Sequence, residues 1–215
     1  DEGMMRVGVE GIVLVHGGMC TSKCWDPLIG HLTGPAVAVD LPGRAGRPAE
    51  LDAVTLDDCV QTVIDVADQA GFERFVLVAH SLGGTAAALA LAGGKLRFER
   101  IVLVSPPSDL VGYSRRFARW HWMPEPLRRA MQAAIEERYG VRWEELELAR
   151  IAPHLTAPAL IIHDRDDRTV PWKQGAAVAQ HWRGARLVTT QGLGHGRILQ
   201  DDAVISAAVA FVGAR

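Results

Sequence analysis

One serine stands where a buried strand is expected to turn directly into a helix. The segment AHSLGG centres on Ser81, with the small residues Ala79 and Gly83 two positions before and after it. Small residues are needed there because a tight turn passes close to neighbouring elements, and the turn lifts the serine hydroxyl above the sheet. A helix N-cap, the alternative role for Ser81, does not need small residues on both sides. The pattern therefore predicts a nucleophilic serine.

A serine hydroxyl is a weak nucleophile, so it needs a nearby base, and that base needs an orienting carboxylate. Downstream of Ser81 the segment HDRDDRTVP (163–171) offers three aspartates, and the glycine-rich segment GLGHG then offers His195. Both segments follow apolar runs typical of strands, so we expect them at the same edge of a sheet as Ser81. The order serine, acid, histidine predicts a catalytic triad with one of the three aspartates as its acid.

Backbone N–H groups that could bind a developing oxyanion are expected on two sides of Ser81. The helix that starts there points free N–H groups toward a nearby anion, and Leu82, the residue after the nucleophile, supplies one of them. The segment HGGM (16–19) follows the first apolar run, and its glycines let the backbone approach the site closely. We expect Gly18 to be the second donor, with Met19 as the alternative, because the sequence does not fix the register of this loop.

Short apolar runs alternate with helical patterns along the chain. Apolar runs without polar alternation are typical of strands buried on both faces of a parallel sheet. Strands are predicted at 11–18, 36–43, 74–80, 100–107, 159–167 and 185–192, and helices at 55–71, 81–94, 171–182 and 198–212. This order predicts an α/β fold, a mostly parallel open sheet of about six strands with helices on both faces. The active site is then expected at the carboxyl ends of the strands.

The stretch 108–158 has no strand pattern and is expected to be helical throughout. An all-helical insert between two strands is most simply a lid over the strand ends. The predicted organisation is therefore a core of 1–107 and 159–215 with a helical lid of 108–158. From the aromatic and sulfur-containing side chains of the lid we expect a substrate pocket lined by Trp120, Trp122 and Met123, although packing against the sheet is an alternative role for each aromatic residue.

Arginines also crowd the predicted lid. They alternate with glutamates, which is typical of a solvated helix face, and the alternative is that one of them binds an anionic group of the substrate. These residues are Arg115, Arg116, Arg119, Arg128 and Arg129.

Composition narrows the class of protein further. The 215 residues carry a formal net charge of −2, so there is no basic surface that would indicate a nucleic-acid partner. No apolar stretch reaches the roughly 18 residues that span a bilayer, and the first residues lack a secretory pattern. Three cysteines are too few, and odd in number, for a disulfide framework. We expect reduced thiols in a cytoplasmic protein, with a Cys20–Cys24 bridge as the alternative, and no metal or organic cofactor.

Taken together, these motifs resemble those of the α/β-hydrolase fold. The resemblance covers nearly the whole chain through LVHGG, DLPG, AHSLGG, the segment PALIIHDRDDRTVP and GLGH. The family's D-x-x-V-P register implies Asp167 as the triad acid, since it stands three residues before Val170. The segment HGGMCTSKCW resembles the branch that includes plant-type methylesterases and hydroxynitrile lyases. The first two strands of the family are expected to be truncated to MMRVGV (4–9) or lost.

The resemblance implies a serine hydrolase that cleaves a carboxylic ester through Ser81, His195 and Asp167 by way of an acyl-enzyme. Cyanohydrin cleavage on the same scaffold is one alternative, but the related lyases use a lysine near the histidine, where this chain has Arg197 and no lysine. A binding protein without turnover is the other alternative. The expected partner is a small-molecule ester, and the sequence does not indicate its identity or the oligomeric state.

Overall fold

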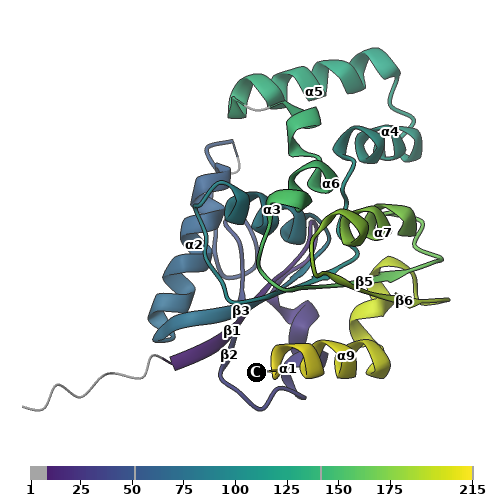
Figure 1. Cartoon of the computed structure of the whole chain (residues 1–215). Coiled ribbons are helices and arrows are strands. Elements are labelled where there is room, and N and C mark those ends of the chain that lie inside the picture. Colours follow the sequence, from purple (N-terminus) through teal and green to yellow (C-terminus); the bar gives the residue numbers. More distant parts are fainter. Residues whose placement is uncertain (1–8, 51, 141, 215) are drawn as a thin grey trace, which may run out of the picture.

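A single parallel sheet of six strands organises the chain (Figure 1). The structure, a computed structural model, describes residues 9–50, 52–140 and 142–214. The strands lie in the order β2-β1-β3-β4-β5-β6, and each neighbouring pair is parallel. They are β1 (Val9–Val15), β2 (Ala36–Val39), β3 (Phe72–His80), β4 (Ile101–Val104), β5 (Ala159–Asp164) and β6 (Arg186–Thr190). The predicted α/β fold is confirmed.

Helices cover both faces of this sheet. Alternate residues of each strand point to opposite faces, so Val13 and Val15 of β1 enter one apolar core while Ile12 and Leu14 enter the other. The first core is closed by α2 (Leu56–Gln69), α3 (Ser81–Ala92), α6 (Leu148–Ile151) and α7 (Trp172–His181), and the second by α1 (Asp26–Ile29) and α9 (Asp202–Val212). Two short 3₁₀ helices also contribute buried residues to the second core: η1 (Ser22–Trp25) and η4 (Ile198–Gln200).

Local sequence signals explain where the helices begin. Thr55 caps α2, since its hydroxyl accepts a hydrogen bond from the Asp58 N–H while the Asp58 carboxylate accepts one from the Thr55 N–H. At the other end of the chain, the Asp201 carboxylate accepts from the N–H groups of Ala203 and Val204 and starts α9. The predicted helix 198–212 is therefore divided at Asp201 into η4 and α9.

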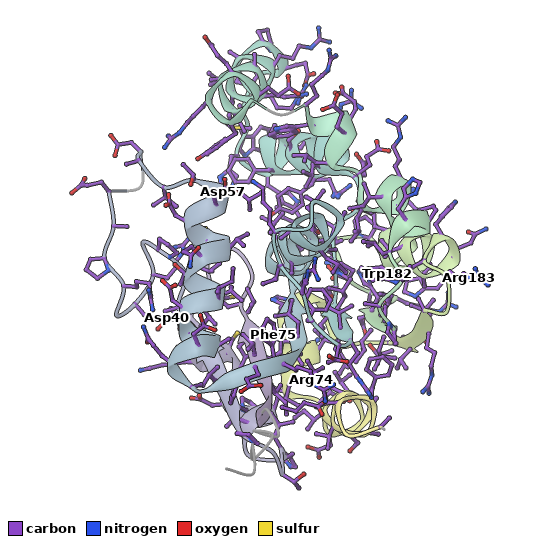
Figure 2. The ribbon with its side chains drawn as sticks, turned by 60° about the vertical axis from the view of Figure 1, so that its left-hand side comes forward. Asp40, Asp57, Arg74, Phe75, Trp182 and Arg183 are labelled. Atoms are coloured by element: carbon purple, nitrogen blue, oxygen red, sulfur yellow. The ribbon has the colours of Figure 1, made fainter. Side chains whose placement is uncertain are left out.

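Strand β3 changes from exposed to buried between two neighbouring residues. In β3, Arg74 is exposed beside Glu10 and Glu99, at 3.8 Å and 3.7 Å, whereas the next residue, Phe75, is buried in the first core (Figure 2). Trp182 closes the same core, and its ring N–H donates to the Ala157 carbonyl over 2.9 Å. A shift of β3 by one residue would expose Phe75, which opposes such a change of register.

The described residues between β4 and β5 form helices joined by short loops, with no strand among them. This segment contains α4 (Leu110–Trp120), α5 (Glu125–Tyr139), η2 (Trp143–Leu146), α6 and η3 (Ala152–His154). Figure 1 shows α4 and α5 on the far side of α3 and α6 from the sheet. Leu148 and Ala152 are fully buried in the first core, so the last part of this segment covers the sheet itself.

Two further expectations concern the first residues of the chain and the three cysteines. Most of the predicted truncated strand, residues 4–8, lies outside the described residues, and Val9 begins β1. The three cysteines, Cys20, Cys24 and Cys59, are free thiols, as expected. In the described part of the chain, no helix is both long and apolar enough to cross a bilayer.

Candidate active site

Ser81 occupies the predicted turn between β3 and α3. Its φ of +52° lies in the left-handed region, which is costly for a residue with a side chain and is found mostly where the surroundings impose it. The surroundings here are tight. A β-carbon on Gly83 would lie 2.3 Å from the His16 carbonyl oxygen, and one on Gly17 would lie 2.8 Å from the β-carbon of Ser81. Close packing therefore explains the glycine two positions after the serine and Gly17 in the facing loop.

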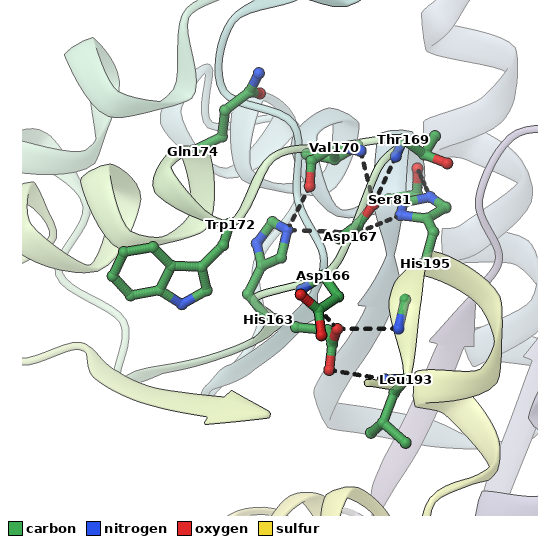
Figure 3. Close-up of polar contacts among 12 residues, drawn as sticks. Ser81, His163, Asp166, Asp167, Thr169, Val170, Trp172, Gln174, Leu193 and His195 are labelled. Atoms are coloured by element: carbon green, nitrogen blue, oxygen red, sulfur yellow. Dashed lines mark hydrogen bonds and ion pairs between the residues drawn. The ribbon is translucent and has the colours of Figure 1, made fainter. Parts of the chain in front are cut away.

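The three residues predicted to form a triad converge at the carboxyl edge of the sheet (Figure 3). His195 Nε2 lies 3.1 Å from Ser81 Oγ, and His195 Nδ1 lies 2.7 Å from Asp167 Oδ2. Because Nδ1 faces a carboxylate, it carries the ring proton, which leaves Nε2 as an acceptor for the serine hydroxyl. Ser81 is buried, whereas the His195 side chain is 20% exposed. The serine is thus oriented toward a base that solvent and small molecules can approach.

The carboxylate of Asp167 is fully buried and surrounded by donors. Its Oδ1 accepts the N–H groups of Thr169 and Val170 at 2.9 Å and 2.8 Å, and its Oδ2 faces His195 and, at 3.5 Å, His163 Nε2. Burial by itself raises the pKa of Asp167, but the hydrogen bonds from the two histidines and Val170 outweigh it and hold that pKa well below the usual value. Asp167 is therefore ionised beside His195.

Two further histidines, His163 and His80, also contact this group. The His163 ring is fully buried, and its Nε2 donates to the Val170 carbonyl over 2.9 Å. His80 Nε2 donates to the His195 carbonyl over 3.1 Å, with the two rings 4.7 Å apart. Burial, followed by the repulsion of a protonated His195, lowers the pKa of His80 to about 4. His80 is consequently uncharged at neutral pH.

The two other aspartates of HDRDDRTVP hold the histidine loop in place rather than contacting His195. Asp164, fully buried at the end of β5, accepts from the N–H groups of Leu193 and Gly194 at 3.1 Å and 3.0 Å. Asp166 accepts from the Gly192 N–H over 3.0 Å. Sequence reasoning missed the role of Asp164, whose only signal is a buried aspartate at a strand end.

The predicted oxyanion donors lie beside the serine. A β-carbon on Gly18 would be 3.4 Å from the Leu82 side chain, so the loop after β1 packs directly on the start of α3. His16 orders this loop: its Nδ1 lies 2.8 Å from the Gly17 carbonyl, and its Nε2 accepts the Leu41 N–H over 3.3 Å. Met19, the alternative donor, has a φ of +63° and an exposed side chain.

A cavity of about 690 Å³ begins at Leu82, the residue after Ser81. Tyr113, Trp143 and other mostly apolar side chains line it. The residues that the sequence predicted for the pocket lie elsewhere, because Trp122 and Trp120 are 92% and 54% exposed and neither they nor Met123 line this cavity.

The buried face of α4 explains the exposure of Trp120. It carries the small residues Ser114 and Ala118, and Ser114 accepts a hydrogen bond from the buried Arg128 of α5 over 3.0 Å. The aromatic residues of α4 are left on its other sides. Of these, Tyr113 turns toward the cavity.

One arginine of the predicted lid reaches the loop of Asp167, the predicted triad acid. Arg116 Nε donates to the Thr169 carbonyl over 3.3 Å, and the N–H of the same Thr169 binds Asp167. Arg128 and Arg129 instead pair with Glu125 of α5, at 2.8 Å and 3.1 Å.

Comparison with known proteins places these features in a family. The model of the alpha/beta hydrolase family matches residues 12–208. The chain is 37% identical over 92 residues to the probable esterase PIR7A of Oryza sativa subsp. indica, covering 40% of this chain and 35% of that protein. It is 36% identical over 83 residues to methylesterase 9 of Arabidopsis thaliana, covering 36% and 32%. The aligned part thus spans about a third of the length of these curated relatives.

The fold is shared more widely than the sequence. A serine hydrolase involved in carbazole degradation, the CarC enzyme, superposes with a TM-score of 0.73 at 16% identity, covering 96% of this chain and 92% of that one. At that identity the likeness concerns the fold alone. With the sheet order, the strand-to-helix turn and the family match over most of its length, the chain belongs to the alpha/beta hydrolase family.

Proposed function

We propose that this protein is a serine hydrolase that cleaves a carboxylic ester. The observation that carries the proposal is the hydrogen-bonded series from Asp167 through His195 to Ser81, at 2.7 Å and 3.1 Å. Both distances are short enough for proton transfer, so the side chains do not have to move before the reaction. The names of the curated relatives, a methylesterase and a probable esterase, support the same class of reaction.

In the first half of the proposed reaction, His195 Nε2 takes the proton of Ser81 as Oγ forms a bond to the ester carbonyl carbon. The N–H groups of Leu82 and Gly18, with Met19 as the alternative to Gly18, bind the oxyanion of the tetrahedral intermediate. His195 then gives its proton to the leaving alcohol as the carbon–oxygen bond breaks. Ionised Asp167 stabilises the imidazolium throughout.

In the second half, water replaces the alcohol. His195 takes a proton from the water as it attacks the acyl-enzyme, and returns that proton to Ser81 as the acid leaves. The balanced products are one carboxylic acid and one alcohol, and the serine is regenerated. The side chains named here supply every proton transfer.

The helical segment 108–158 is the proposed lid. Its residues Tyr113, Trp143 and Leu146 form one wall of the cavity that begins at Leu82, so the segment would cover a substrate bound at Ser81. The apolar lining favours an ester with an apolar group on that side.

Covalent labelling tests the nucleophile directly. A fluorophosphonate probe is expected to label the wild type and not Ser81→Ala, and p-nitrophenyl acetate is expected to be hydrolysed only by the wild type. Ser105 is a matched control, because it follows the adjacent strand β4, is buried and also has a positive φ, of 51°. Ser105→Ala should keep the label. An unlabelled wild type would favour a binding protein, and release of cyanide from mandelonitrile would favour a lyase.

A further inference from the structure

The cavity follows one face of helix α3, which starts at the proposed nucleophile. Leu82, Ala86 and Leu89 line it at spacings of four and three residues, so they lie on the same side of the helix. All three are only half-buried. The residues on the opposite side of α3 are buried: Gly84, Ala87 and Ala88. The cavity is therefore a groove along the outer face of α3.

The remaining walls of this groove are also mostly apolar. Tyr113 of α4, Ile135 of α5 and Trp143 of η2 line the side formed by the helical segment. The start of α2 supplies Leu56 and Cys59. Apolar walls of this kind stabilise a ligand mainly by removing its hydrocarbon surface from water.

The far end of the groove is polar and open to solvent. Lys95, which follows α3, pairs with Asp57 at the start of α2, and their side chains are 52% and 68% exposed. Figure 2 shows Asp57 at the end of α2 that lies toward the helical segment. A ligand that runs along α3 from Ser81 thus leaves the apolar walls at this ion pair.

We propose, building on the esterase function above, that the groove binds the unbranched acyl chain of the substrate and selects chains of about eight carbons. Leu82 and Leu89 are seven residues apart, so the apolar face of α3 is about 10 Å long at 1.5 Å per residue. An extended chain advances about 1.2 Å per bond, so about eight carbons fill that length. Further carbons meet the Lys95–Asp57 pair and water.

The geometry favours the acyl chain over the alcohol as the occupant. Neither Ser81 nor His195 is among the described residues that line the groove, and the alcohol has to receive its proton from His195. The groove instead starts at Leu82, whose N–H is a proposed donor to the carbonyl oxygen. The leaving alcohol then lies on the His195 side, while the acyl chain follows α3.

Hydrolysis of p-nitrophenyl esters of increasing acyl length measures the selection. We expect kcat/KM to rise by up to about fourfold per methylene from acetate to octanoate and to level off beyond it. Ala86→Phe, which fills the groove, should lower the octanoate-to-acetate ratio of kcat/KM at least tenfold. Ala134→Phe is the matched control, because Ala134 is an exposed residue of α5 next to Ile135, and it should keep the ratio of the wild type.

A direct binding measurement separates this inference from the esterase function. Calorimetric titration of Ser81→Ala protein with butanoate, hexanoate, octanoate and dodecanoate should show affinity rising up to octanoate, and the Ser81→Ala/Ala86→Phe protein should lose that rise. Equal affinity for butanoate and octanoate, or ester hydrolysis that does not depend on acyl length, would overturn the acyl groove even if esterase activity is found. A dependence on length in alkyl acetates alone would also overturn it, since the groove would then bind the alcohol.

Discussion

His163 and His195 face the same carboxylate oxygen of Asp167. His195 Nδ1 lies 2.7 Å from Oδ2 and His163 Nε2 lies 3.5 Å from it, while the Val170 carbonyl takes the shorter hydrogen bond of His163, at 2.9 Å. The acid is thus positioned by a second, fully buried imidazole that is remote from the proposed substrate. A side chain in that place acts on the reaction only through Asp167.

Replacing His163 should reduce turnover more than substrate binding. His163→Phe removes a donor to Asp167 and leaves the Val170 carbonyl without its partner, so we expect kcat to fall about tenfold, or roughly 1.4 kcal/mol, with KM little changed. His163→Gln keeps an N–H donor and should recover much of the loss. Steady-state kinetics with p-nitrophenyl esters, beside thermal unfolding curves, measures both. Equal activity of the Phe and Gln variants at equal stability would show that His163 has no positioning role.

Asp167→Asn should abolish most activity while keeping the fold. The amide can present an N–H to His195 Nδ1, which favours the ring tautomer that protonates Nε2, and that nitrogen can then no longer accept the Ser81 proton. We expect kcat to fall by about 10⁴, as in other triads. Asp166→Asn is the control, because Asp166 accepts from Gly192 and does not contact His195. A similar loss in both variants would mean that the whole loop, and not the acid, was disturbed.

Part of this site could be predicted from sequence because its signals are local. Ser81 is marked by small neighbours, and His195 and Asp167 each follow an apolar strand, so the parallel sheet brings all three to one edge. The roles of Asp164 and His163 left no such pattern. Asp164 binds the N–H of Gly194, 30 positions away, and a hydrogen bond to a distant backbone group imposes no residue type on its partner.

The pocket could not be predicted because several sides of α4 carry residues that could face inward. Aromatic residues at helical spacing indicate a common face of the helix. In α4, however, the buried face is the one with Ser114 and Ala118, and Ser114 accepts a hydrogen bond from Arg128 of α5. That contact turns Tyr113 toward the cavity and leaves Trp120 mostly exposed. Burial within an all-helical segment thus depends on how its helices pack, which spacing alone does not determine.

Gly83→Ala should destabilise the turn that carries Ser81, the proposed nucleophile. Its β-carbon would lie 2.3 Å from the His16 carbonyl oxygen, so the loop after β1 has to move. We expect the free energy of unfolding to fall by about 2 kcal/mol and Tm by about 4–8 °C. The esterase activity should also fall, because the loop that has to move carries Gly18, a proposed oxyanion donor. Gly46→Ala is the control, because nothing lies within 4 Å of its added carbon. Unchanged melting of Gly83→Ala, measured by circular dichroism, would contradict the close approach.

Protonation of His80 should lower the free energy of unfolding as the solution becomes mildly acidic. Its pKa is lowered to about 4 in the folded chain, from an ordinary value of about 6.5, by burial first and by the nearby His195 second. Between these values the unfolded chain binds the proton more strongly, so the stability is present above about pH 6.5 and is lost as the pH falls toward 4. The lowered pKa values of Asp164 and Asp167 reduce stability only as the pH falls below about 5, so they do not contribute between about pH 7.5 and about pH 5.

Urea unfolding at several pH values measures this effect. From about pH 7.5 to about pH 5 the free energy of unfolding should fall by about 2 kcal/mol more in the wild type than in His80→Gln. The glutamine amide can still donate to the His195 carbonyl, which His80 binds over 3.1 Å, but it does not titrate. Parallel curves for the two proteins would mean that protonating residue 80 costs the fold nothing. The imidazole between Gly17 and the His195 loop would then have to be accessible to water, contrary to its 3% exposure.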